Sequence, residues 1–208
     1  MPDGNKIAVL ISGSGTTLKN LIHWRTEQKL SADIELVISN NVAAGGLVFA
    51  SEANIPHLVV SHKDFKDVAE FSDAIFSAIQ AANIDLVVMG GFLRRLTIPP
   101  AYENRVINIH PSLIPAFCGQ GFYGQKVHQA VIDYGCKISG CSVHYVDDQY
   151  DHGPIIAQET VPVEIADTAK TLAKRIFAKE CQLYPDVINK IIEGDVMIKD
   201  RCVEISQR

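Results

Sequence analysis

The chain has 208 residues, of which 47% are hydrophobic and 21% are charged, and its formal net charge is −5. This balance is typical of a soluble globular protein that is long enough to bury a substantial core. The acidic charge and the lack of a long basic run argue against a nucleic-acid platform. No stretch reaches the about 18 apolar residues of a membrane span, and the first residues lack a signal-peptide pattern. We therefore expect a cytoplasmic protein that binds neither nucleic acid nor membrane.

Five cysteines are scattered along the chain, at Cys118, Cys136, Cys141, Cys181 and Cys202. An odd number with no Cys-x-x-Cys motif is typical of reduced thiols in a cytoplasm. The closest pair has no second pair to complete a tetrahedral metal site. The sequence therefore predicts neither a disulfide framework nor a metal site.

Strands and helices alternate along the first hundred residues. Continuous apolar runs predict buried strands at Lys6–Ile11, Ile34–Ser39, Pro56–Ser61 and Asp85–Met89. Helical spacing predicts a helix after Gly15 and further helices at Ala43–Ala53 and Phe65–Ala82. Uninterrupted apolar strands separated by helices indicate a parallel sheet with helices on both faces.

The pattern changes after residue 100. A strand begins at Val106, and a glycine-rich loop at 116–125, expected to be mobile, leads into a helix at Gln125–Tyr134. Strands are predicted at Gly140–Val146 and Ile155–Val163, then a helix at Ala166–Ile192, capped by Asp167 or Thr168, and a terminal hairpin at 196–205. The short connection between the two strands predicts an antiparallel pair.

These elements predict one α/β domain over residues 1–208. We expect an open, mostly parallel twisted sheet of about seven strands with helices on both faces. We expect a Rossmann-like half over about residues 1–100, and an antiparallel strand in the half over about residues 101–208.

Two polar side chains interrupt the strand that begins at Val106. Asn108 and His110 are two residues apart and therefore point to the same side of the strand, and Pro111 ends the ladder because it has no N–H group. Ligands of open α/β sheets bind at such carboxyl ends. An amide and an imidazole there could stabilise a developing oxyanion. The structural alternative is a capped strand end with two satisfied polar groups.

The first strand ends in the turn Ser12-Gly13-Ser14-Gly15-Thr16-Thr17. It lacks the Gly-Lys-Ser/Thr of a P-loop, the third glycine and the distant acid of a dinucleotide site, and the Gly-x-Ser-x-Gly of a nucleophile elbow. The remaining interpretation is that the backbone amides of Gly15, Thr16 and Thr17 bind a monophosphate, because a glycine-rich helix start attracts anions. The alternative is a tight turn with Ser/Thr capping.

Three acids, Asp147, Asp148 and Asp151, lie in the loop between the two antiparallel strands. If Asp151 approaches His110, the two form an acid–base couple that can handle one proton. The alternative is a solvated acidic turn. We interpret His144 as a hydrogen-bonded structural histidine and His152 as an exposed one.

The segment Gly90-Gly91-Phe92-Leu93-Arg94-Arg95-Leu96 follows the fourth strand. Apolar side chains next to exposed backbone groups can hold a flat heterocycle. A helix-entry turn packed on the core is the alternative.

Together these stretches resemble the phosphoribosylglycinamide formyltransferases. The residues that carry the resemblance are Ile11-Ser12-Gly13-x-Gly15, Gly91-Phe92-x-Arg94, Asn108-x-His110-Pro111-Ser112-Leu113-x-Pro115 and Asp151-x-Gly153-Pro154, over about Lys6 to Ile192. The length leaves no room for the extra domain of the methionyl-tRNA formyltransferases or of the formyltetrahydrofolate hydrolases. The resemblance implies direct formyl transfer from 10-formyltetrahydrofolate, a co-substrate, to glycinamide ribonucleotide in purine synthesis, by a monomer or homodimer.

The resemblance also implies roles for matching residues. Asn108 and His110 stabilise the tetrahedral oxyanion, and Asp151 orients His110 and assists proton transfer from the amine. The amides of Gly15, Thr16 and Thr17 hold the phosphate, and Glu180 binds the ribose hydroxyls. The folate pocket is lined by Phe92, Leu93, Arg94, Leu96, Asn108, Val146, Asp147, Asp148 and Asp151. The family's cis proline corresponds to Ile114–Pro115.

Three departures from the family pattern stand out: Thr17 replaces a common Asn, His152 replaces a small residue, and the 117–125 loop lacks a His-x-His pair. Three rival functions also remain open. They are hydrolysis of formyltetrahydrofolate, non-catalytic nucleotide binding, and formyl transfer to another phosphorylated sugar amine.

Overall fold

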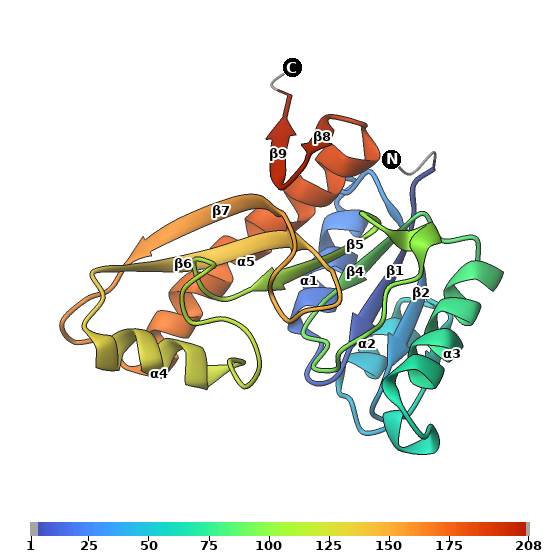
Figure 1. The fold of residues 1–208 in the computed structure, drawn as a ribbon, viewed down its shortest axis with the longest axis horizontal. Helices are drawn as coiled ribbons and strands as arrows, with labels where there is room; N and C mark the ends of the chain where they lie inside the picture. The colour runs from blue at the N-terminus through green and yellow to red at the C-terminus, as the bar shows by residue number, and fades with distance from the viewer. Residues whose placement is uncertain (1–3, 207–208) are drawn as a thin grey trace.

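A computed structural model describes residues 4–206, and seven of its strands form one twisted sheet in the order β3-β2-β1-β4-β5-β6-β7 (Figure 1). Strand β6 is antiparallel to both of its neighbours, whereas the other neighbouring pairs are parallel. The predicted fold class is therefore confirmed. The strands are β1 (Lys6–Ile11), β2 (Asp33–Ser39), β3 (His57–Val59), β4 (Leu86–Met89), β5 (Val106–His110), β6 (Ile138–Tyr145) and β7 (Ile155–Pro162).

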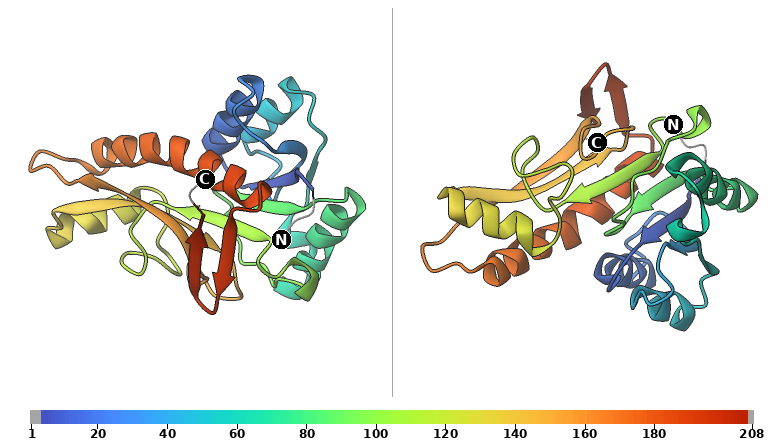
Figure 2. Two further views of the ribbon diagram at one scale, coloured as in Figure 1. Left: turned by 90° about the horizontal axis from the view of Figure 1, so that it is seen from above. Right: turned by 60° about the horizontal axis from the view of Figure 1, so that its bottom comes forward.

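Helices cover both faces of the sheet because both faces of its central strands are apolar. In β1, Ile7 and Val9 belong to the core on one face, while Ala8 and Leu10 belong to the core on the other. The first core is closed by α1, α2, α4 and α5, and the second by α3 (Figure 2). The helices are α1 (Thr16–Thr26), α2 (Gly46–Glu52), α3 (Val68–Ala81), α4 (Gln125–Tyr134) and α5 (Ala169–Ile192).

Side-chain caps decide where two of the predicted helices begin. The helix expected from Phe65 begins instead at Val68, because the Asp67 carboxylate accepts a hydrogen bond from the Glu70 amide at 2.9 Å. A short 3₁₀ turn at His62–Asp64 precedes it. The long helix expected from Ala166 begins at Ala169, with Thr168 as its cap. Among the other differences, α2 and β3 are shorter than predicted, and β6 begins at Ile138 rather than at Gly140.

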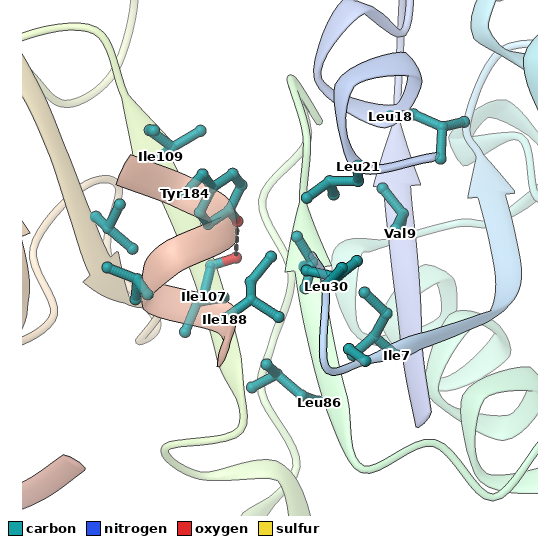
Figure 3. Packing of buried hydrophobic residues seen from close by; sticks show 14 of the residues in the cluster. Ile7, Val9, Leu18, Leu21, Leu30, Leu86, Ile107, Ile109, Tyr184 and Ile188 are labelled. Atoms are coloured by element: carbon teal, nitrogen blue, oxygen red, sulfur yellow. Dashed lines mark hydrogen bonds between the residues drawn. The ribbon is translucent and has the colours of Figure 1, made fainter. Parts of the chain in front are cut away.

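The strand order reverses between β1 and β4, because β2 and β3 lie on one side of β1 and the later strands lie on the other. Such a reversal places a ligand crevice at the carboxyl ends of β1 and β4. Helix α5 packs beside this point, against the neighbouring strands β4 and β5. The Tyr184 hydroxyl lies 3.0 Å from the Ile107 carbonyl of β5 (Figure 3). It also lies 3.1 Å from the Met89 carbonyl of β4. Tyr184 and Ile188 of α5 thus contact the same strand that carries Asn108 and His110.

The chain ends in a separate two-stranded hairpin, β8 (Val196–Lys199) and β9 (Cys202–Ile205), as predicted. Its tip lies beside the connection between β6 and β7 (Figure 2). Within residues 4–206, no helix combines the length and apolar character needed to cross a bilayer.

Candidate active site

Strand β5 delivers two polar side chains to the carboxyl edge of the sheet. Asn108 pairs with Met89 on one side and with His144 on the other, and its side-chain nitrogen lies 3.2 Å from His144 Nε2. His110 is 4% exposed, and its Nε2 lies 2.9 Å from the Phe117 carbonyl. The carbonyl can only accept, so Nε2–H donates to it and the ring is fixed with Nδ1 toward Asp151.

The connection between β6 and β7 brings Asp151 to these two residues. One carboxylate oxygen, Oδ2, is 3.3 Å from His110 Nδ1, and the other, Oδ1, is 3.4 Å from the Asn108 side-chain nitrogen. Oδ2 also accepts a hydrogen bond from the Gly119 amide at 2.8 Å. The structure therefore brings together an amide, an imidazole and a carboxylate from segments that are about 40 residues apart.

The neighbours of these groups set their protonation. Burial alone would raise the Asp151 pKa, but the His144 hydrogen bond, the His110 charge and the Gly119 amide outweigh it and hold that pKa below its ordinary value. Burial lowers the His110 pKa, and the charge of Asp151 opposes this shift only in part. The Asp151 carboxyl is therefore ionised at neutral pH, and negative charge that develops beside His110 raises the pKa of that histidine.

His144 is a residue whose place in this cluster we did not predict. It is 1% exposed, and its Nδ1 donates to the Tyr145 carbonyl at 2.7 Å, as expected of a structural histidine. Its Nε2, however, lies 3.6 Å from Asp151 Oδ1. The cross-strand register places His144 opposite Asn108. Residue spacing alone does not give this register, so it could not be predicted from the sequence.

A cavity of about 520 Å³ opens beside the cluster. Thr16 and Thr17 at the start of α1 line it, whereas Gly15 caps the helix with a φ of 71° and no side-chain capping bond. A Cβ at Gly15 would collide with the Cα of Gly46, so only glycine fits there. The turn thus exposes a helix N-terminus to the cavity, the arrangement that binds anions.

Glu180 reaches the same cavity from α5. It is half-buried, and burial raises its pKa to about 7. A carboxyl group poised near neutral pH can accept hydrogen bonds from hydroxyl groups or donate one of its own.

The predicted folate residues fall into three groups. Phe92, Arg94, Leu96, Val146 and Asp147 line a narrower cavity of about 60 Å³ that also touches Asn108 and Asp151. Leu93 lines the larger cavity instead, and its amide donates to the Ser12 hydroxyl at 2.8 Å. Asp148 lines neither cavity, because its carboxylate accepts from the Ile98 amide at 3.3 Å.

Sequence reasoning missed further residues of the large cavity. The loop before α4 contributes Gly119 to Gly124, and the helices contribute His128, Ala173 and Phe177. Tyr150 lines both cavities. Their sequence neighbourhood carries no motif, since they come from separate segments that meet only in the folded chain.

The chain matches the formyl transferase family model over residues 5–188. It is 38% identical over 197 residues to the phosphoribosylglycinamide formyltransferase of Haemophilus influenzae, covering 94% of this chain and 91% of the relative. The chain belongs to the phosphoribosylglycinamide formyltransferase family. Its predicted enzyme class is thereby confirmed at the level of the family.

A solved relative agrees with this assignment. The glycinamide ribonucleotide transformylase 1 of Symbiobacterium toebii superposes with a TM-score of 0.92 at 36% identity, covering 98% of this chain and 95% of that one. The human trifunctional purine biosynthetic protein adenosine-3 is 38% identical over 195 residues. That match covers 93% of this chain but only 19% of the human protein, so the chain spans about a fifth of that relative.

Two departures from the formyltransferase pattern can now be located. His152 turns away from the cluster, and its Nδ1 lies 2.6 Å from Asp147 Oδ2. The 117–125 loop contacts the cluster through backbone groups of Phe117 and Gly119 rather than through histidines. The Ile114–Pro115 bond is cis, as the resemblance implied.

Proposed function

We propose that the protein transfers the formyl group of 10-formyltetrahydrofolate to the amine of N1-(5-phospho-D-ribosyl)glycinamide, a step of de novo purine biosynthesis. The convergence of Asn108, His110 and Asp151 at the mouth of a 520 Å³ cavity is the observation that supports it. The residues at 1–100 would supply the nucleotide-binding half and those at 101–208 the catalytic and folate-binding half. We keep the cytoplasm as the expected location.

In this proposal the amine attacks the formyl carbon directly. A C–N bond forms, the formyl oxygen becomes an oxyanion, and the bond to folate N10 then breaks. The Asn108 amide donates to the oxyanion, and so does His110 Nδ1 once it is protonated. Developing negative charge raises the His110 pKa, so the histidine takes a proton from solvent as the oxyanion forms and returns it when the oxyanion collapses.

Asp151 orients His110 and accepts the proton that the amine loses, through water. That proton can then pass to N10 of the departing tetrahydrofolate, so the net reaction consumes no acid or base. No side-chain nucleophile takes part. The hydroxyl that follows the catalytic strand, Ser112 Oγ, donates to the Ala116 carbonyl at 2.6 Å instead.

The two substrates would occupy the two cavities. The nucleotide phosphate would meet the amides at Gly15, Thr16 and Thr17, and its ribose would meet Glu180. The folate ring would enter between the 92–96 segment and the 146–151 loop, with Asn108 and Asp151 at the boundary. Leu93 and Asp148 have the least support as folate-binding residues. The Leu93 amide donates to the Ser12 hydroxyl, and the Asp148 carboxylate accepts from the Ile98 amide.

The test is the turnover of Asn108→Ala and His110→Ala. Removing one oxyanion donor should lower kcat by about 10²–10³-fold while the circular-dichroism melt shows a folded protein. His23→Asn, an exposed histidine on α1, is the matched control and should keep full activity. Full activity in either site variant would refute the proposal.

A hydrolase that passes the formyl group to water would use the same three residues. Tetrahydrofolate release should therefore be measured with and without glycinamide ribonucleotide. Our proposal expects release only when the nucleotide is present. Equal release without it favours hydrolysis, and release with a different phosphorylated sugar amine favours that acceptor.

A further inference from the structure

The cavity assigned to the nucleotide lacks strong positive charge. Among the described residues, none that lines it is lysine or arginine, whereas Asp151 and Glu180 both present carboxyl groups. A phosphate monoester adds a charge of about −1.5 to −2 at pH 7. The N-terminus of α1 offers the equivalent of only about +0.5. A buried anion needs a compensating cation, so another group in the lining must supply one.

His128 is the group that fits this need. It lies in the first part of α4, is 4% exposed, and lines the cavity together with Ala173 and Phe177 of α5. Its Nδ1 is buried and has no hydrogen-bond partner. Buried polar atoms are normally paired, so an unpaired imidazole nitrogen on a residue that lines a cavity requires an explanation.

The surroundings of His128 keep it neutral while the cavity is empty. Burial lowers its pKa, and the charge of His110 lowers it further. The other titratable groups that line the cavity are Tyr123, Tyr150, Asp151 and Glu180. An entering dianion would reverse the balance, because a nearby negative charge favours the protonated imidazole.

We propose that His128 is the cationic partner of the substrate's phosphate group, protonated from solvent when the dianion enters and hydrogen-bonded to it. This inference rests on the proposed function, which supplies the phosphate. A histidine suits the task because it carries charge only when the anion is present. A lysine at this position would bury an unpaired charge in the empty cavity.

The rival cation is Lys126 on the same helix. Its ammonium lies 5.0 Å from the ring centre of Tyr123, which also lines the cavity. Replacing each residue separately distinguishes the two. His128→Gln should raise KM for glycinamide ribonucleotide about 10- to 100-fold and leave kcat within about twofold, the loss expected for a charge-assisted hydrogen bond. Lys126→Met should leave both constants unchanged. The opposite pattern would overturn the inference.

A measurement on the wild-type protein avoids dependence on the variant's folding. Long-range ¹H–¹⁵N spectra distinguish neutral from protonated imidazoles, and the His128 signal is assigned by its loss in His128→Gln. At pH 7.5, saturating ribose 5-phosphate should convert that signal to the imidazolium pattern, whereas ribose should not. A His128 signal that stays neutral with ribose 5-phosphate bound, or a failure of ribose 5-phosphate to bind, would sink the idea.

The outcomes separate this inference from the proposed function. Normal formyl transfer with a neutral His128 leaves the function standing and removes the inference. A protonated His128 with no formyl transfer to glycinamide ribonucleotide removes the proposed function and leaves His128 as the partner of the phosphate group.

Discussion

Asp151 shows how a single residue is held for its task. Its φ is 51°, in the left-handed region, where aspartate is tolerated better than most residues but still at a cost of about 1 kcal/mol or more. In this conformation its two oxygens reach His110, Asn108 and the Gly119 amide. The sequence could predict which three side chains belong together, because their family motif is specific. It could not show that His144 lies against the same carboxylate, because strand register is invisible in the sequence.

Glu180 provides a prediction at the residue scale. Its pKa is raised from 4.5 to about 7 by burial, so the folded state holds the proton more tightly than the unfolded state does. This carboxyl therefore favours folding at low pH, and that contribution is lost as the pH rises from about 4.5 through about 7. Glu180→Gln stays neutral throughout. At pH 8 it should melt about 2–8 °C above the wild type, and at pH 4.5 the two should coincide.

Thermal melts followed by circular dichroism at the two pH values give the answer. Glu52→Gln, an exposed carboxyl on α2, is the control and should track the wild type at both. If Glu180→Gln were less stable than the wild type at pH 8, the carboxyl would be making favourable contacts as an anion. KM for the nucleotide should rise in this variant, because the amide offers the ribose hydroxyls one acceptor oxygen where the carboxylate offers two.

At the scale of elements, the loops and the terminal hairpin contribute contacts around the candidate site that the sheet alone does not provide. Most helices and strands could be predicted from apolar periodicity, and the remaining errors lie at ends that single caps such as Asp67 decide. The contact between the terminal hairpin and the 147–153 loop could not be predicted from the sequence, because it joins residues that share no sequence pattern. Arg201 at the hairpin tip donates to the His152 carbonyl at 2.5 Å, directly after Asp151.

This contact predicts that Arg201 positions the loop. Arg201→Met should lower kcat about 3- to 10-fold, since a small displacement of a catalytic carboxylate is costly, with little change in KM for the nucleotide. Steady-state kinetics with each substrate varied in turn is the measurement. Lys199→Met, an exposed residue of the same hairpin, serves as control. Unchanged kcat in Arg201→Met would mean that the loop holds Asp151 without the hairpin.

At the scale of the whole molecule, the joint between β4 and β5 ties the first four strands of the sheet to the strands that follow in the chain. The alternation of strands and helices could predict a mostly parallel sheet, but not the order that puts β4 beside β1 and opens the crevice there. Helix α5 locks this joint from one face. Its Tyr184 ring is 1% exposed, and the hydroxyl lies between the carbonyls of Met89 and Ile107 (Figure 3).

Tyr184→Phe tests this joint because it removes one oxygen and keeps the ring. The two buried carbonyls then lose the single O–H donor that they share, which should lower the free energy of unfolding by about 1–3 kcal/mol and the melting temperature by about 2–4 °C per kcal/mol. Denaturant unfolding measures the loss, and Tyr134→Phe, whose side chain is 82% exposed, should show none. Activity per folded molecule should persist, because Asn108 and His110 keep their own hydrogen bonds. A Tyr184→Phe protein as stable as the wild type would mean that apolar packing alone holds α5 against the two strands.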